Sequence, residues 1–444
     1  MNWILPIGST LLLDGISQPL QIVRGIGGGS QGQVYEVRMD SQPLALKWYF
    51  PSFLRQDHHL RSRLAECIHA GEPSENFLWP LALLRGRDSV VGQVNPDDRG
   101  FGYLMKLRPQ GYISAMQHYG GFVNLSIASA LKICFNLVDA FNSLHSKGFC
   151  YKDISLGNLF MEHESGNILV CDNDNVDIEG QNQSAVLGTP GYMAPEILMG
   201  QVKPSRNSDL FSLAVLIFRL LTRHDPFHGK MERQIQCLDE PARRHLYGHD
   251  PVFIFHTSDG RNSPDPNDHK AALIMWPIYP KALQDLFLQT FVAGLRNPWL
   301  RTLTGQWRQG IATTLDQRFL CRTCGQENFP EMTAQFNHCW NCQSKQQLGA
   351  SLHCGSSTIR VAEGNEIHPY HFSPFTEIRT NDPWGLVVCN PKQASILGLK
   401  NLSQEAWQAE LSNGDTVVVA PGRATNLEST DRILTSRGKI KVVR

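Results

Sequence analysis

Three polar side chains between residues 153 and 172 are spaced so that they could act together on a phosphate group. Asp153 and Asn158 stand five residues apart in an apolar setting, and Asp172 follows a short hairpin later. One carboxylate could reach an acceptor hydroxyl, while an amide oxygen and a second carboxylate hold Mg²⁺ against nucleotide phosphates. The spacing predicts phosphoryl transfer, although solvated turns rich in Asp and Asn have the same composition.

A glycine-rich run near the N-terminus is a second candidate for phosphate binding. Residues 22–26 have the pattern of a strand, residues 27–32 read GGGSQG, and residues 33–37 alternate like a second strand. Glycine lets backbone N–H groups approach a phosphate, because no Cβ stands in the way. A dinucleotide-binding fold would need a helix directly after the glycines. The strand pattern after Gly32 argues against that fold, and a flexible hairpin is the plain alternative.

A lysine at the end of an apolar run could complete the phosphate site. Lys47 closes such a run, where a buried ammonium group is costly without a partner. The helical segment 60–69 offers Glu66, because Gly71 and Pro73 are expected to end that helix. Lys47 would then hold the α- and β-phosphates while Glu66 orients it. The alternative is a surface lysine beside an unrelated glutamate.

These features occur with further motifs whose order resembles the protein-kinase family from about residue 22 to residue 307. Residues 188–196 (GTPGYMAPE) look like the substrate-side loop of that family, and residues 208–221 look like its buried central helix. The resemblance implies an α+β fold with two lobes, residues 1–106 and 107–315, and ATP bound between them under the glycine run.

By the same resemblance, individual residues take defined roles. The expected catalytic residues are Asp153, Lys47, Glu66, Asn158 and Thr189. The expected nucleotide contacts are Gly27, Gly29, Gly32, Val34, Ala45, Lys47, Met105 and Leu107. The expected ligands of Mg²⁺ or Mn²⁺ are Asn158 and Asp172. Thr189 would bond Asp153. Asp209 would tie the central helix to the catalytic loop, and Arg301 would pair with Glu196.

The chain departs from the usual family pattern near these residues. Ser155 stands where many serine/threonine kinases carry a lysine, and Asp172-Asn173-Asp174 replaces Asp-Phe-Gly. The missing lysine removes a positive charge from the phosphate site. Asp174 would either supply another oxygen to the metal or point to solvent, and burial of the Asn173 amide would lack assured partners. The alternative to an active kinase is a pseudokinase, a nucleotide-binding scaffold that presents its C-terminal modules to partners.

The segment from Asp172 to Glu196 corresponds to the family's activation segment. Its acceptor hydroxyls are chiefly those of Ser184, Thr189 and Tyr192. Lys152 replaces an arginine that often pairs with a phosphorylated loop residue, and it would attract phosphate only as a point charge. We expect autophosphorylation at Ser184 with modest activation.

The departures themselves narrow the resemblance. Residues 153–158 (DISLGN) and 171–176 (CDNDNV) look like bacterial kinases linked to tellurite-resistance and stress operons, and residues 246–255 and 276–280 also look similar. Such kinases are typically encoded beside a metal-dependent protein phosphatase and a von Willebrand factor A domain protein. The resemblance therefore implies partners of these two kinds and a role in bacterial stress signalling.

Two Cys-x-x-Cys pairs follow the kinase-like region. Cys321 and Cys324 are separated from Cys339 and Cys342 by fourteen residues. Four thiolates with this spacing match a tetrahedral zinc site, in which the metal replaces the core that so short a segment lacks. Two reducible dithiols are the alternative. We expect a zinc ribbon over residues 316–348, and kinase activity largely independent of it because it lies outside the two lobes.

The last part of the chain, residues 349–444, has the pattern of a small β-sandwich. The expected strands are residues 384–389, 406–411, 416–420, 432–435 and 439–443. The region faintly resembles a forkhead-associated domain. The Arg and Ser with which that family reads phosphothreonine have no recognisable counterpart here, so phosphopeptide binding is not inferred.

Composition limits the classes of function. The 444 residues include 41 basic and 41 acidic ones, so no overall field favours nucleic acid or an anionic membrane. No apolar run approaches the ~20 residues of a membrane span, and the N-terminus lacks the basic start of a secretory signal. Eleven cysteines argue against a fully paired disulfide framework. We expect a cytoplasmic enzyme that acts on protein substrates, with residues 229–280 as an insertion or long loop.

Overall fold

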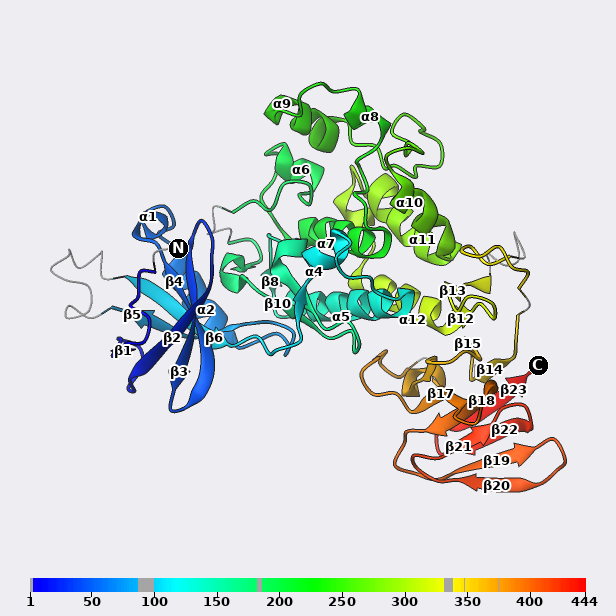
Figure 1. Cartoon of the computed structure of the whole chain (residues 1–444). Helices are drawn as coiled ribbons and strands as arrows, with labels where there is room; N and C mark the ends of the chain where they lie inside the picture. Colours follow the sequence, from blue (N-terminus) through cyan, green and yellow to red (C-terminus); the bar gives the residue numbers. More distant parts are fainter. Residues whose placement is uncertain (1–2, 87–99, 182–185, 331–337, 347, 374) are drawn as a thin grey trace.

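The computed structural model describes residues 3–86, 100–181, 186–330, 338–346, 348–373 and 375–444. A strand-rich lobe lies at the left of Figure 1, a helical lobe at its centre and a β domain at its lower right. Buried apolar side chains form two clusters in the first lobe and one in each of the other two parts. The predicted mixture of helices and strands, followed by a β-rich C-terminal part, is confirmed.

One antiparallel sheet, with strand order β1-β2-β3-β4-β6-β5, forms the first lobe. Its strands are β1 Thr10–Leu11, β2 Leu20–Gly28, β3 Gly32–Met39, β4 Gln42–Tyr49, β5 Pro80–Arg85 and β6 Phe101–Lys106. Two helices, α1 Pro51–Leu54 and α2 Leu60–Ala70, follow β4. The α2 helix ends where predicted, because Gly71 takes a φ of 71° and its amide bonds the last helical carbonyl groups.

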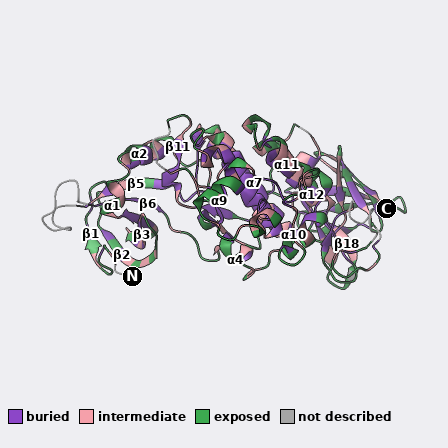
Figure 2. Cartoon of the chain, turned by 90° about the horizontal axis from the view of Figure 1, so that it is seen from above, coloured by how far each residue is buried: buried purple, intermediate pink, exposed green. Residues whose placement is uncertain are grey.

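The second lobe is mainly helical. Its α-helices are α4 Ala115–Tyr119, α5 Ile127–Ser146, α6 Pro195–Leu198, α7 Arg206–Thr222, α8 Lys230–Arg233, α9 Glu240–Arg244, α10 Lys270–Met275, α11 Lys281–Leu288 and α12 Thr304–Gln317. Short strands are β7 Ile113–Ser114, β8 Phe149–Cys150, β9 Leu159–Met161, β10 Ile168–Val170 and β11 Asp177–Ile178. Short 3₁₀ or π turns are η2 Leu156–Asn158, η3 Asn173–Asn175, η4 His245–His249, η5 Trp276–Ile278, η6 Gln289–Ala293 and η7 Pro298–Leu300. Figure 2 shows α7 in the colour of buried residues along most of its length, as predicted for the central helix.

The α5 helix is long and apolar enough to cross a membrane by length and composition. However, 67% of an apolar 18-residue stretch of this helix is buried inside the protein, where α5 packs against α7 and α12. The core helix of a folded domain can have the same length and composition, so α5 is weak evidence for a membrane span.

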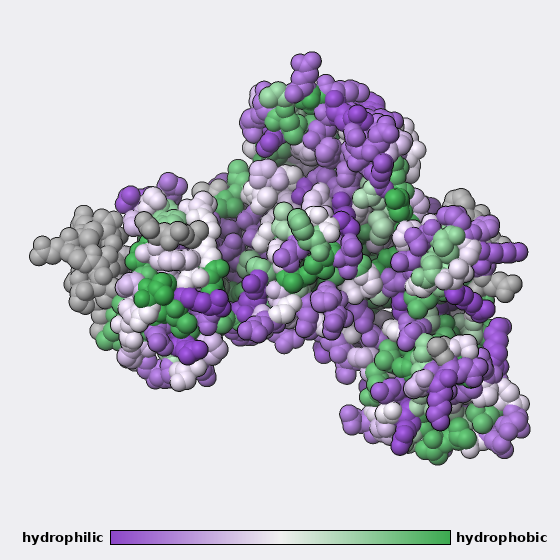
Figure 3. All heavy atoms as spheres, viewed as in Figure 1, coloured by the Kyte–Doolittle hydropathy of each residue, from purple (hydrophilic) through white to green (hydrophobic). Residues whose placement is uncertain are grey.

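Residues 229–280 were predicted to be an insertion or long loop, and they contain α8, α9, η4 and α10 instead of a single open loop. The helices α8 and α9 lie at the top of Figure 1, and this part of the visible surface is largely hydrophilic in Figure 3. Asn262 is 2% exposed, and its amide nitrogen donates to the carbonyl oxygens of Phe227 at 2.8 Å and Val252 at 2.7 Å. The bond to Phe227 joins the segment to the residues that precede it, and the bond to Val252 holds two parts of the segment together.

The cysteine-bearing segment packs on the helical lobe. It contains the paired strands β12 Phe319–Leu320 and β13 Glu327–Asn328. Phe329 is fully buried within the apolar cluster of the lobe, with its ring centroid 6.2 Å from that of Tyr279. This short segment therefore shares a core with the helices.

The C-terminal domain has two antiparallel sheets, with orders β15-β14-β23-β22-β19-β20 and β16-β17-β18-β21. Its strands are β14 Ser351–Cys354, β15 Ser357–Arg360, β16 Glu366–Ile367, β17 Gly385–Asn390, β18 Gln393–Asn401, β19 Trp407–Leu411, β20 Thr416–Val419, β21 Ala424–Asn426, β22 Thr430–Thr435 and β23 Gly438–Val443. A 3₁₀ turn, η8 Pro369–His371, follows β16. Side chains of both sheets, with Trp407 fully buried, form one core. All five predicted strands occur.

Candidate active site and metal centre

The predicted catalytic loop follows β8 and is held by α7. Asp209, in the first turn of α7, accepts hydrogen bonds from the backbone amides of Tyr151 at 2.7 Å and Lys152 at 2.9 Å. His145 Nε2 lies 3.0 Å from the same carboxylate, whose side chain is 1% exposed. The predicted tie between the central helix and this loop is therefore confirmed.

Asp153, Asn158 and Thr189 come together as predicted. Thr189 Oγ1 donates to Asp153 Oδ1 at 2.5 Å. Asn158 Nδ2 donates to the Asp153 carbonyl oxygen at 2.9 Å and to its Oδ2 at 3.2 Å. Since Asn158 uses its amide nitrogen for these bonds, its amide oxygen is available to a cation. Thr189 and Asn158 thus fix the orientation of the Asp153 carboxylate. A fixed carboxylate is needed to orient the hydroxyl group of a substrate.

Asp172 opens the tight turn η3 after β10. Its backbone is left-handed, with φ 54° and ψ 49°, and its side chain is 46% exposed. Asp172 Oδ1 lies 3.3 Å from Lys47 Nζ. Partial burial raises the pKa of the Asp172 carboxyl, with the charge of Lys47 acting against it. The geometry presents a carboxylate, accessible from outside, beside the Lys47 ammonium group.

The partner of Lys47 differs from the prediction. Lys47 Nζ lies 2.7 Å from Asp174 Oδ2 and 3.0 Å from Gln31 Oε1. Glu66 is not among its ion pairs. The buried seam of α2 consists of Leu60, Arg63, Leu64 and Cys67. Glu66 lies outside this seam and is half-buried, so the predicted Lys47–Glu66 pair is corrected to Lys47–Asp174.

Asp174 neither points to solvent nor lacks partners. Its side chain is 1% exposed, and Tyr49 Oη donates to Asp174 Oδ2 at 2.5 Å. Burial acts to raise the pKa of Asp174, but the charge of Lys47 and the bonds from Lys47 and Tyr49 lower it overall. Burial acts to lower the pKa of Lys47, and the two neighbouring carboxylates raise it overall. The pair is therefore charged.

Asn173 is also buried, and its amide nitrogen is satisfied. It donates to the carbonyl oxygens of Leu78 at 2.9 Å and Val170 at 3.1 Å. The expectation that a buried amide would lack assured partners here holds for the amide oxygen, which has no hydrogen-bond partner among the described residues, and not for the amide nitrogen.

The glycine run forms the predicted hairpin between β2 and β3. A Cβ added at Gly32 would lie 2.3 Å from the Trp48 carbonyl oxygen, so packing on β4 requires this glycine. A Cβ at Gly27 or Gly29 would meet no atom within 4 Å. The fold therefore does not explain these two glycines, whereas the close approach of a phosphate would.

Side chains expected around the nucleotide base gather in one apolar cluster. Ala45 and Met105 face each other across β4 and β6, and Val34 and Leu107 pack on the same cluster. This arrangement provides an apolar surface next to Lys47, which is the environment that a purine ring requires.

The predicted pair at the substrate-side loop is present. Arg301 binds Glu196 through two bonds of 2.8 Å, and the Arg301 side chain is fully buried. A pocket of about 330 Å³ lies on the same side, beside Pro190 and Gly191. Its other lining residues are Met193, Leu198, Arg219, Asp225, Leu238, Glu240, Arg243 and Tyr247. Because Pro190 follows Thr189, this pocket adjoins the Asp153 site.

Lys152 does not occupy the position expected of a phosphate-binding residue. Its Nζ lies 2.7 Å from Asp177 Oδ2, and both side chains are fully buried. Because the ammonium group is buried against this carboxylate, Lys152 does not face a phosphate on the activation segment, contrary to the expectation. Ser184, the predicted phosphorylation site, lies outside the described residues.

The four predicted zinc ligands converge. The sulfur atoms of Cys321, Cys324, Cys339 and Cys342 all lie within 4.8 Å of one another, and two of the Sγ–Sγ distances are 3.6 and 3.7 Å. Zn–S bonds of about 2.3 Å in a tetrahedron place sulfur atoms about 3.8 Å apart. The donor set therefore fits Zn²⁺, as predicted.

Backbone and amide groups support this cluster. Gly325, with φ 73°, donates its amide to the Cys321 carbonyl oxygen at 2.9 Å and closes the first knuckle. Asn328 Nδ2 lies 3.5 Å from Cys339 Sγ, and Gln346 Nε2 lies 3.3 Å from Cys321 Sγ. Such N–H donors stabilise the negative charge of metal-bound thiolates.

Sequence reasoning missed Tyr49 and Asp177, and it named Asp174 without its partner Lys47. Tyr49 carried a usable signal, because it stands two positions after Lys47 and alternate residues of a strand point to the same face. Asp174 and Asp177 contact lysines far away along the chain, so their spacing carried no comparable signal.

Comparisons with known proteins agree with this geometry. The protein kinase domain family matches residues 105–259. Protein kinase C delta type from Mus musculus is 40% identical over 214 residues, which cover 47% of this chain and 30% of the relative. Serine/threonine-protein kinase YPK2/YKR2 from Saccharomyces cerevisiae is 26% identical over 214 residues, with the same two coverages. A probable cAMP-dependent protein kinase catalytic subunit from Encephalitozoon cuniculi is 26% identical over 213 residues, 48% of this chain and 62% of the relative.

The chain thus spans less than a third of the length of the mouse relative that it matches. The family match covers Asp153, Asn158 and Asp172 and begins after Lys47, and serine/threonine kinases are among the relatives. Residues 105–259 are therefore similar to the protein kinase domain, and the relatives of the chain named above are protein kinases.

Proposed function

We propose that this chain transfers the terminal phosphoryl group of ATP to serine and threonine hydroxyls of protein substrates, including its own. The observation that carries the proposal is the fixed Asp153 carboxylate, bonded by Thr189 at 2.5 Å and by Asn158 at 3.2 Å. A carboxylate held in this way orients an acceptor hydroxyl and accepts its proton.

The remaining roles follow from the same geometry. ATP with Mg²⁺ or Mn²⁺ supplies the activated phosphoryl group. Asn158 and Asp172 would hold the metal through an amide oxygen and a carboxylate, which are suitable ligands for a hard cation. Lys47 would bind phosphate oxygens. The open space over Gly27 and Gly29 supports a close approach of the phosphates to the backbone.

A protein substrate would lie against the substrate-side loop. The pocket beside Pro190 combines apolar side chains with paired charges such as Arg219 and Asp225. Its volume of about 330 Å³ suffices for a side chain of a bound peptide. This position, one residue from Thr189, supports a polypeptide as the acceptor.

The test is a phosphorylation assay with radiolabelled ATP and Mg²⁺ on the full chain. We expect Asp153→Ala to lower the rate at least about 100-fold, as for loss of a general base. The exposed Asp382 provides the matched control, because Asp382→Asn removes a carboxylate far from the site. Labelling of Asp153→Ala at the wild-type rate would contradict the proposal. Nucleotide binding without any labelling of wild type would instead indicate a pseudokinase, which the kinase relatives do not favour.

We further propose that the four cysteines bind one zinc ion, and that the protein acts in the cytoplasm in bacterial stress signalling. The convergence of the sulfur atoms supports the metal. The likeness of the catalytic loop to stress-operon kinases supports the signalling role and two partners, a metal-dependent protein phosphatase and a von Willebrand factor A domain protein. Co-purification of the tagged chain with each candidate partner, with Asp153→Ala as a substrate-trapping variant, tests these partners.

A further inference from the structure

We propose that Asp174 is the residue that positions Lys47, and that α2 acts on this pair through Arg63 rather than through Glu66. The proposal rests on the phosphotransfer function above, because it assigns the group that orients the phosphate-binding lysine. Nothing in the usual pattern Asp-Phe-Gly would place a carboxylate at this position.

The ion pair is built from one strand and one turn. Lys47 and Tyr49 are two residues apart on β4, so both side chains lie on the same face. Both donate to Asp174 Oδ2, Lys47 at 2.7 Å and Tyr49 at 2.5 Å. The side chains of Lys47 and Asp174 are 6% and 1% exposed. A buried ammonium group without a charged partner is strongly disfavoured, so Asp174 fixes where Lys47 can lie.

The metal-binding turn is part of the same arrangement. Lys47 Nζ also lies 3.3 Å from Asp172 Oδ1, two residues before Asp174. Lys47 therefore bridges two carboxylates of one turn, one of which belongs to the proposed metal ligand Asp172. The turn that contains Asp172 and Asp174, and not the α2 helix, therefore positions Lys47.

The α2 helix contacts this turn through a different residue from the one expected. Arg63 is 1% exposed and forms two bonds with Asp57, at 2.9 and 2.7 Å. The same guanidinium group donates to the Asp174 carbonyl oxygen at 3.2 Å. Because Arg63 holds the backbone of Asp174, a shift of α2 would reach Lys47 through the turn, with no contribution from Glu66.

The experiment compares Asp174→Asn, Tyr49→Phe and Glu66→Gln with wild type. Binding of a non-hydrolysable ATP analogue with Mg²⁺ is measured by calorimetry, alongside kcat and KM for ATP. We expect Asp174→Asn to weaken nucleotide binding and raise KM by about tenfold or more, since an orienting charge pair is lost. Tyr49→Phe should have a smaller effect in the same direction. Glu66→Gln should change binding less than about twofold.

Two controls separate the outcomes. Asp382→Asn is the matched exposed substitution, and thermal unfolding reports whether each variant folds. If Asp174→Asn does not fold, the comparison of Tyr49→Phe with Glu66→Gln tests the proposal. Nucleotide binding that is weakened in Tyr49→Phe and unchanged in Glu66→Gln supports it. A tenfold loss in Glu66→Gln, or unchanged binding in a folded Asp174→Asn, overturns it. Calorimetry needs no turnover, so failure of phosphotransfer in wild type would leave this test intact and contradict only the proposed function.

Discussion

The side-chain carboxylate of Glu327 accepts a hydrogen bond from the backbone amide of Ala128 at 3.1 Å, so the cysteine-bearing segment caps α5. The same carboxylate accepts from the Ile127 amide and pairs with Arg318 at 3.1 Å. The first amides of a helix have no partner within the helix, and negative charge is favourable there. A residue three positions after Cys324 therefore stabilises the core helix that leads to the catalytic loop.

The position of Glu327 changes the expected role of the zinc segment. The sequence suggested that kinase activity would be largely independent of the ribbon, since it follows the two lobes. The structure instead places Phe329 in the core of the helical lobe and Glu327 on the first turn of α5. We therefore expect loss of the metal to weaken the lobe itself.

Our first prediction is that the chain contains one zinc ion and that its loss destabilises the kinase domain. Metal analysis of reduced, freshly purified protein should give about one zinc per chain. Cys321→Ser should lower the Tm by roughly 5–10 °C, which corresponds to a loss of about 2–3 kcal/mol in a domain of this size. Cys237→Ser is the matched control, because Cys237 is exposed and outside the cluster. An unchanged Tm in a zinc-free Cys321→Ser protein would show that the segment is an independent module.

Our second prediction isolates the cap from the metal. In zinc-loaded protein, Glu327→Ala should cost at least about 1 kcal/mol of unfolding free energy, as for loss of a helix cap. The buried Arg318 guanidinium would also lose its charged partner, which adds to the cost. Glu327→Gln keeps an acceptor oxygen and should lose less. Urea unfolding measures all three proteins, with the exposed Glu428→Ala as control. Equal stability of Glu327→Ala and Glu428→Ala would mean that the cap contributes nothing.

Local signals in the sequence predicted much of the fold and the site. Asp153, Asn158 and Thr189 lie on loops whose motifs fix their geometry, and they meet as expected. Among the five predicted β-domain strands, β19 begins with alternating buried and exposed residues, and β23 alternates over most of its length. The missed strands are β14, β15, β16, β18 and β21; β18 contains Gly398, which interrupts an apolar pattern, and the other four have two to four residues each.

The remaining contacts depend on tertiary packing. Lys47 and Asp174 are separated by 127 residues, and Glu327 and Ile127 by 200. Lys47 could have paired with Glu66 instead of with Asp172 and Asp174 of the turn. The rotation of α2 decides between them by turning Arg63 inward, and no spacing in the sequence encodes that rotation.

Our third prediction concerns Lys152 and Asp177, which form a fully buried ion pair with an Nζ–Oδ2 distance of 2.7 Å. Lys152→Met should destabilise the protein by about 3–5 kcal/mol, because it leaves a buried carboxylate without its cation. The double variant with Asp177→Asn should recover a large part of this loss. Urea unfolding of the single and double variants measures the coupling energy. Additive effects would contradict a structural role for this pair.

The same pair bears on regulation. With Lys152 buried against Asp177, a phosphate on the activation segment cannot gain this ammonium group as a partner without breaking the pair. We therefore expect phosphatase-treated protein to keep most of its activity, even where Ser184 is phosphorylated after incubation with ATP. Mass spectrometry and the kinase assay together measure this. The opposite result would be kinase activity that needs a phosphate on the activation segment and that Lys152→Met removes. Such a result would support the original expectation that Lys152 binds this phosphate.

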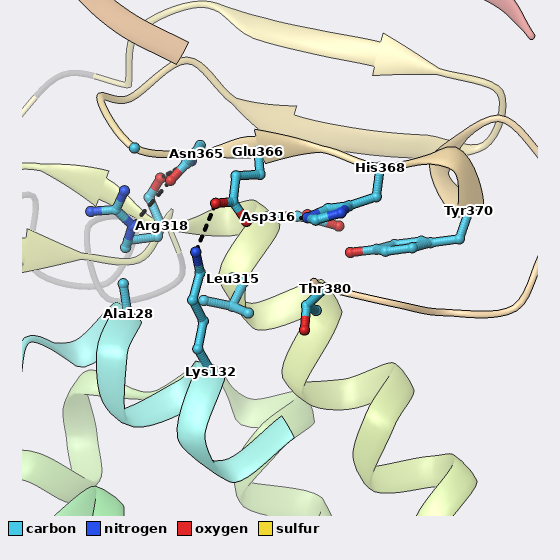
Figure 4. A pocket seen from close by; sticks show the side chains of 11 residues that line it. Ala128, Lys132, Leu315, Asp316, Arg318, Asn365, Glu366, His368, Tyr370 and Thr380 are labelled. Atoms are coloured by element: carbon cyan, nitrogen blue, oxygen red, sulfur yellow. Dashed lines mark hydrogen bonds and ion pairs between the residues drawn. The ribbon is translucent and has the colours of Figure 1, made fainter. Parts of the chain in front are cut away.

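The last prediction concerns the junction between the helical lobe and the β domain, shown in Figure 4. Lys132 of α5 points toward Glu366 of the β domain, with a distance of 2.7 Å between Nζ and Oε1. His368 Nε2 lies 3.3 Å from the other oxygen of Glu366. These side chains line a cavity of about 20 Å³, large enough for one water molecule.

Burial acts to raise the pKa of Glu366, but the hydrogen bonds from His368 and Lys132 and their charges hold it below the ordinary value of 4.5. A carboxyl group whose pKa is lower in the folded state stabilises the fold fully above its unfolded pKa. That contribution is lost as the pH falls from 4.5 through the folded pKa. Asp316, whose carboxylate lies 3.1 Å from His371 Nε2, changes stability with pH in the opposite direction. Burial raises the pKa of Asp316, so its contribution to stability falls as the pH rises.

We therefore expect Lys132→Met to reduce stability by about 1.5–3 kcal/mol near neutral pH, the usual range for a charged hydrogen bond. The difference from wild type should shrink as the pH falls below 4.5 and through the lowered pKa of folded Glu366, because the carboxylate then becomes protonated. Urea unfolding across this range measures the difference, and the exposed Lys392→Met is the matched control. Glu366→Gln should show the same loss near neutral pH. If the difference between wild type and Lys132→Met is the same at every pH, Glu366 is not the group that titrates.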